Sequence, residues 1–126
     1  MGMIPNSEKA ALDYLRAELG VPVYVVPPKA AALPYVRVHR VGGDMRNIVT
    51  DAPLLIIGCY ASDPYDASEL ANRAREAMFN ARGTWIGRTW VRWWEEVGGP
   101  SFFPDPDINA TRYQFTGILT VATNTV

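Results

Sequence analysis

The strongest pattern in the chain lies at residues 51–83, where an uncharged run is followed by apolar residues at helical spacing. The run at 54–60 has no charge and no alternation, and turn residues bound it, which is typical of a strand covered on both faces. After it, Asp63 is a suitable helix cap, Pro64 suits the first helical position, and Asp66 is a second possible cap. Alanine, leucine and methionine then recur every three or four residues until Gly83, which is predicted to end the helix. This unit is predicted to be the central strand and main helix of the fold.

A first helix and four more strands are predicted around this unit. Asn6 or Ser7 can cap a helix that runs to about Leu19, and Gly20 ends it. The strands are short stretches of β-branched and aromatic residues with turn residues at their ends. They lie at 21–26, 35–41, 90–97 and 112–122.

Three connecting segments carry information of their own. Residues 44–51 are mostly polar, and they form either a long hairpin loop or a mobile flap. Residues 83–87 are predicted to form a turn. The glycines and proline at 98–100 are predicted to close the strand before them, and 101–110 is predicted to be a loop with two phenylalanines.

The predicted fold class is α+β, with one mixed or antiparallel sheet of four to five strands and two helices packed on it. The 126 residues are enough for a single domain, 1–126, whose core is large enough to be stable without disulfides or bound metals. Two helices cannot cover both faces of such a sheet. We therefore expect the uncovered face to meet another protein surface, most simply a second copy of the chain.

Composition narrows the class of protein without naming one. The net charge of −1 argues against a dedicated nucleic-acid binder, although it leaves room for a local basic patch. The N-terminal residues lack the features of a signal peptide, and no stretch reaches the length of a membrane span, so we expect a protein made in the cytosol. Cys59 is the only cysteine, which excludes an intrachain disulfide, and its place in an apolar strand predicts an inert thiol.

Candidate catalytic residues are few. His39 is the only histidine, and it lies on a strand that also carries Arg37. It is interpreted as a half-exposed strand residue, and the alternative is a small enzyme or ligand-binding domain with a pocket formed by His39, Arg37 and Tyr60. No spacing suits a zinc site or a phosphate loop, so no metal and no cofactor is expected. Asp105 and Asp107 can touch a cation, but a Pro-rich segment favours a turn-forming role for them.

Arginines and aromatic residues are the candidates for contacts with other molecules. Tryptophan and phenylalanine are enriched at interface centres, and the stretch 90–103 holds more large aromatics than a small core needs. The predicted interface residues are Trp90, Trp93, Trp94, Phe102 and Phe103. Arginines on the strands and loops are either solvated, or paired with a neighbouring subunit, or turned towards DNA phosphates. The residues predicted to pair with a neighbouring subunit or to face DNA are Arg37, Arg40, Arg46 and Arg112.

The order of these motifs is similar to that in a known protein family. The relevant segments are LPYVRV at 33–38, the following VGG at 41–43, the apolar strand at 53–60 with its Asp63-capped helix, and RYQFT at 112–116. With these segments the chain resembles the tail terminator proteins of long, non-contractile-tailed bacteriophages, especially those infecting actinobacteria. The tryptophan-rich strand and the Phe102–Phe103 segment have no counterpart in the family pattern.

The resemblance implies a structural virion protein without enzymatic activity. Such a subunit forms a homo-hexameric ring that caps the tail tube, ends its polymerisation and offers a docking surface to head-completion or neck proteins. Double-stranded DNA passes through the central hole, and near-neutral net charge suits a conduit that must not hold DNA tightly. The implied location is the head–tail junction of the virion, with assembly in the host cytoplasm. The segment 42–51 is then predicted to face the lumen or the tube, and another neck protein of the same virion remains the nearest alternative.

Overall fold

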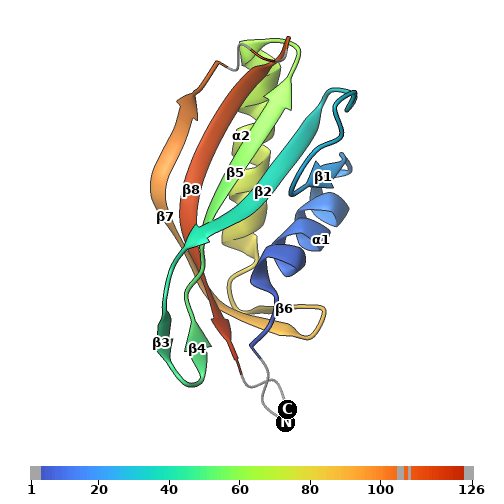
Figure 1. Ribbon diagram of the computed structural model, residues 1–126. Coiled ribbons are helices and arrows are strands. Elements are labelled where there is room, and N and C mark those ends of the chain that lie inside the picture. The colour runs from blue at the N-terminus through green and yellow to red at the C-terminus, as the bar shows by residue number, and fades with distance from the viewer. Residues whose placement is uncertain (1–3, 105–106, 108, 124–126) are drawn as a thin grey trace.

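The computed structural model describes residues 4–104, 107 and 109–123, which form two helices and one curled mixed sheet. The helices lie on the same side of the sheet (Figure 1). The elements in chain order are α1 (Ser7–Leu19), β1 (Val23–Tyr24), β2 (Tyr35–Gly42), β3 (Met45–Asn47), β4 (Thr50–Asp51), β5 (Leu54–Ala61), α2 (Pro64–Asn80), β6 (Thr84–Ile86), β7 (Thr89–Phe102) and β8 (Thr111–Ala122).

The predicted central strand is central in the structure. β5 pairs with β2 on one side and with β8 on the other, both antiparallel, and β8 pairs in turn with β7. β1, which falls within the strand predicted at 21–26, adds to β2 in parallel through only two residues. β3 and β4 form a hairpin that joins β8 through β4, and β6 pairs with the start of β7.

The sheet has eight strand segments, so the prediction of four to five strands was too low. The extra segments β3, β4 and β6 are two or three residues long, which is too short to give a periodic pattern in the sequence. The segment at 44–51 is therefore a hairpin with exposed side chains on β3, and 84–86 is a strand where a turn was expected.

Both helix starts follow from their caps as predicted. The Asn6 side chain accepts a hydrogen bond from the Lys9 backbone N–H at 3.0 Å, and Asp63 accepts one from Asp66 N–H at 2.9 Å. Gly20 ends α1 in the left-handed conformation, with a φ of 68°. The prediction that Gly83 ends the second helix was wrong, because α2 already stops at Asn80.

β7 is longer than predicted, since it continues through the glycines and proline at 98–100 to Phe102. Its pairing with β8 shifts register around Gly98, so bulges absorb extra residues while β8 continues to offer pairing partners. This is the physical reason why residues that normally close a strand did not close this one.

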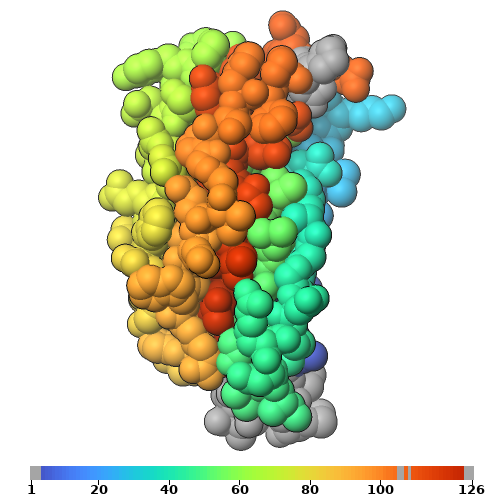
Figure 2. Space-filling model, turned by 90° about the vertical axis from the view of Figure 1, so that its left-hand side faces the viewer, coloured from blue at the N-terminus to red at the C-terminus, as the bar shows by residue number. Residues whose placement is uncertain are grey.

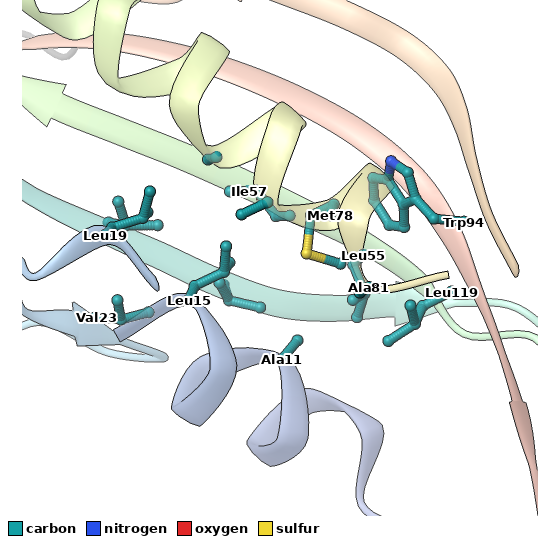
Figure 3. Packing of buried hydrophobic residues seen from close by; sticks show 14 of the residues in the cluster. Ala11, Leu15, Leu19, Val23, Leu55, Ile57, Met78, Ala81, Trp94 and Leu119 are labelled. Atoms are coloured by element: carbon teal, nitrogen blue, oxygen red, sulfur yellow. The ribbon is translucent and has the colours of Figure 1, made fainter. Parts of the chain in front are cut away.

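The core lies between the helices and one face of the sheet. Buried alanines on α2 let the helix approach the strands closely, and side chains from α1, β5, α2 and β7 meet around Met78 (Figure 3). Trp94 is fully buried there, and its indole lies over Gly117 of β8, in the space that a side chain at 117 would need.

Candidate interaction surfaces

The face of the sheet away from the helices is open and only half buried. Along β5, Leu55 and Ile57 point into the core, whereas Leu54 and Ile56 lie on the other face and are partly exposed. The strand predicted to be covered on both faces is therefore covered fully on one. The cause is the placement of both helices on the same side.

The register of the strands defines the rows of this open face. His39 of β2 lies opposite Ile56 of β5, which lies opposite Thr116 of β8. One row along, Leu54 lies opposite Ile118, which lies opposite Glu95 of β7. The face is thus a mixture of partly exposed apolar residues and polar groups, a composition common in interfaces between subunits that also exist separately.

At one end of the open face, aromatic rings and an arginine form a ladder across five segments. The Tyr35 ring stacks on Tyr60 with centroids 4.6 Å apart, and Tyr24 meets Tyr35 edge-on at 5.8 Å. Arg112 lies between the Tyr60 and Phe103 rings, 5.8 Å and 5.6 Å from their centroids, and its Nη1 donates to the Tyr60 hydroxyl at 3.2 Å. These contacts fasten the outer ends of the strands to one another.

Gly58 provides the room for that ladder. A Cβ at this position would stand 3.3 Å from the Tyr60 ring and 3.6 Å from the Arg112 side chain. The missing side chain in the middle of β5 therefore lets Tyr60 and Arg112 lie across the sheet.

The four arginines predicted to contact a neighbour or DNA lie in different settings. Arg40 makes a bidentate ion pair with the buried Asp51, at 2.9 and 3.1 Å, and also donates to the carbonyls of Gly42 and Gly43. Its donors thus hold the base of the β3–β4 hairpin. Arg37 donates from Nε to the Val25 carbonyl at 2.8 Å.

The other two arginines differ in exposure. Arg112 is built into the aromatic ladder, whereas Arg46 lies on the exposed strand β3. The role predicted for this set of arginines remains a prediction. Of the four, Arg46 has the side chain most free to meet another molecule.

The five aromatic residues predicted at an interface divide between surface and core. Trp94 is 0% exposed and lies in the core of the subunit. Its prediction as an interface residue was therefore wrong, because its side chain does not reach the surface. Trp93 is 53% exposed, and the Arg82 guanidinium lies 4.8 Å from its ring. Trp90 is half-buried against Trp85.

The two phenylalanines are both exposed and both pack on β8. The ring centroids of Phe102 and Tyr113 are 5.6 Å apart, and the Phe103 ring packs against the Arg112 guanidinium. Beyond the pairing of its first residues with β6, β7 has one edge without a partner strand in the described part of the chain. Figure 2 shows this strand running along the face of the molecule.

The alternative small-molecule site is not assembled by the fold. His39 and Arg37 share the open face with Tyr60, but Tyr60 is buried in the ladder. Neither of the two cavities described below includes any of the three. Burial, followed by the charge of Arg37, lowers the pKa of His39, and Glu8 opposes this shift.

Cys59 is fully buried, and burial raises the pKa of its thiol to about 12. At neutral pH the thiol is therefore protonated and unreactive, as the sequence predicted.

Two cavities lie at the end of the molecule where α2 begins. One, of about 330 Å³, is lined by apolar residues that include Leu33 and Leu70 and by the acidic Asp66 and Glu69. The other, of about 390 Å³, lies beside the proline-rich 27–28 segment and Tyr35. Within residues 4–104, 107 and 109–123, no group of histidine, cysteine and acidic side chains is arranged to hold a metal ion. The suggested cation contact of Asp105 and Asp107 includes a residue outside the described ones.

Among the described residues, no helix is both long and apolar enough to cross a bilayer.

Sequence reasoning missed two contributors to the surface. Trp85 lies on β6 and is 58% exposed, and Arg82 lies beside the Phe79 and Trp93 rings. The sequence did carry a signal for the strand that holds Trp85. The three residues before Gly87–Arg88 and the three after it have the pattern of a short hairpin. The tyrosine ladder gave no such signal, since its members come from three separate strands.

The comparisons with known proteins show a likeness of fold. No protein-family model matches the chain, and no curated protein matches it. A chain in the solved structure described as the virion of a native gene transfer agent (GTA) particle has a similar fold, with a TM-score of 0.62. The match covers 86% of this chain and 84% of that chain at 16% sequence identity, so this α+β fold is one that occurs in a subunit of a virion-like particle.

Proposed function

We propose that this protein is a structural component of a virion, acting as a tail terminator. In this role six copies form a ring that caps the tail tube, ends its polymerisation and offers a docking surface to a head-completion or neck protein. DNA passes through the ring during ejection. The protein has no catalytic turnover and no cofactor.

The observation that carries the proposal is the match of nearly the whole fold to a chain of a gene transfer agent particle. That likeness supports a virion subunit, and the order of motifs described above narrows the proposal to the terminator. The open sheet face and the unpaired edge of β7 add support, because both are surfaces that an assembling subunit would cover.

The decisive experiment is electron microscopy of particles whose genome lacks this gene. A missing terminator should give overlong tails, or tails that remain unjoined beside filled heads, because only the stop signal is absent. Complementation with the intact gene is the matched control. Tails of normal length that fail to attach would favour a neck protein, and intact infectious particles would contradict a structural role.

A further inference from the structure

One end of the molecule presents a group of aromatic and arginine side chains, of which Arg82, Trp85, Arg88 and Trp93 are exposed. Arg82 lies 5.3 Å from the Phe79 ring and 4.8 Å from the Trp93 ring, and Trp85 lies 5.2 Å from Trp90. Arg88 follows in the β6–β7 turn and is exposed to solvent. We call this set the Trp–Arg patch; its members are Phe79, Arg82, Trp85, Arg88, Trp90 and Trp93.

The positive charge of the Trp–Arg patch is not neutralised within the subunit. In the described part of the chain neither Arg82 nor Arg88 forms an ion pair, and Glu96, on the same strand as Trp90 and Trp93, is already bound to Arg75 through two hydrogen bonds of 2.5 and 2.8 Å. Tryptophan and arginine are the residue types that dominate binding energy at protein interfaces. The patch therefore has the chemistry of a contact with an acidic protein surface.

The same chain carries such a surface at the other end of α2. Asp63, Asp66 and Glu69 are exposed on the first turns of the helix, and the 330 Å³ cavity lies beside them. Within the described residues none of the three forms an ion pair, and Arg73, which also lines the cavity, donates to the Leu19 carbonyl. The pKa of Asp66 is raised, mainly by the charge of Asp63, so negative charge accumulates here.

The two surfaces cannot meet within one subunit. α2 has 17 residues, which places its two ends about 25 Å apart at 1.5 Å per residue. Figure 2 shows the light-green start of α2 near the top and its yellow end lower on the same side. Two complementary surfaces at opposite ends of one molecule suit a head-to-tail contact, and such contacts generate closed rings or open filaments.

We propose that the Trp–Arg patch of one copy docks on the acidic start of α2 in a second copy, with Trp85 entering the cavity beside Asp66 and Glu69. Arg82 and Arg88 then face the carboxylates of that second copy, and the apolar residues that line the cavity receive the indole. The inference rests on the proposed ring, for which it supplies the contact between neighbouring subunits.

Charge reversal tests the contact. One variant carries Arg82→Glu and Arg88→Glu, and another carries Asp66→Lys and Glu69→Lys while keeping the helix cap Asp63. Each alone should reduce the association constant between copies by about tenfold or more, because like charges then face each other. Mixed in equal amounts, the two variants should assemble again, since every contact in an alternating ring pairs opposite charges.

The measurement is the mass distribution by analytical ultracentrifugation, with circular dichroism to verify folding. A variant with Lys9→Glu and Lys29→Glu has the same change of net charge as the first variant, and both residues are exposed but lie outside the two surfaces, so it should assemble like the unchanged protein. Trp85→Ala provides a second test, and it should weaken assembly at high salt as well as at low salt.

The outcomes separate this inference from the proposed function. If the unchanged protein assembles and both charge-reversed variants assemble equally well, the contact is wrong while the terminator role stands. If the mixture fails to assemble although each variant is folded, the pairing of these two surfaces is also wrong. An unchanged protein that stays monomeric would exclude a second copy as the partner, whereas the tail phenotype of the deletion decides the function separately.

Discussion

Two adjacent isoleucines on β5 show the difference between the two sides of the sheet. Ile57 is fully buried under the helices, and Ile56, the residue before it, lies on the open face and is partly exposed. The same contrast separates Trp94, which lies in the core, from Trp93, which lies on the surface beside Arg82. One chain completes the helix-covered side, whereas the other side stays partly exposed and, in the described part of the chain, most of one β7 edge has no partner strand.

The tryptophan pair should give the largest contrast in stability. Trp94→Ala removes a fully buried side chain and leaves a cavity, so we expect the free energy of unfolding to fall by about 3–5 kcal/mol. Trp93→Ala removes a half-exposed ring and one cation–π contact. The lost cation–π contact should lower the free energy of unfolding by only about 0.5–1 kcal/mol. Urea denaturation of both variants measures the difference, and similar losses would show that the two sides are packed alike.

The isoleucine pair tests the same contrast without aromatic chemistry. Ile57→Ala should lower the free energy of unfolding by about 2–5 kcal/mol, and Ile56→Ala should lower it by clearly less because its side chain is already partly solvated. Repeating both measurements on the assembled protein sharpens the comparison. A larger loss for Ile56→Ala in the assembly than in the subunit would place a neighbour on the open face.

Substitutions at two glycines compare the tightly packed core with the exposed edge of the sheet. Gly117→Ala forces a methyl group against the Trp94 indole and the Glu95 backbone carbonyl, and overpacking of this kind costs about 1–3 kcal/mol. Gly98 lies on the exposed edge, and no atom stands within 4 Å of the place that its Cβ would take, so Gly98→Ala is the matched control. Equal thermal unfolding of the two variants would mean that the indole can move aside freely.

The exposed aromatics should affect assembly far more than folding. In a triple variant with Trp93→Ala, Phe102→Ala and Phe103→Ala, the lost side chains are all exposed, so the subunit should stay folded. If these residues contact neighbouring chains, its rings should be fewer or absent in negative-stain electron micrographs. Normal ring assembly by the triple variant would remove them from the interface.

The smallest predicted effect concerns pH. The pKa of His39 is lowered in the folded protein, so between that value and the ordinary value of about 6.5 the unfolded chain binds more protons. The free energy of unfolding should therefore decrease as the pH falls below about 6.5, and His39→Gln should weaken this dependence. Urea titrations at pH 7.5 and pH 5 measure it, and an unchanged dependence in the variant would assign it to other groups.

Local sequence determined the elements whose signals are contained in a few neighbouring residues. Asn6 and Asp63 fixed both helix starts through their own hydrogen bonds, and the apolar run at 54–60 correctly predicted the strand at the centre of the sheet. These predictions succeeded because capping and hydrophobic periodicity act over one or two turns of the chain.

Tertiary structure decided what depends on partners far along the chain. β3, β4 and β6 are too short to be recognised alone, and β7 passes through Gly98 and Gly99 only because β8 continues beside it. Trp93 and Trp94 differ only in which side of the strand they occupy, and a bulge between Val91 and Trp93 sets that. A one-residue shift moves every following side chain to the other face, so the composition of a strand does not determine which of its residues are buried.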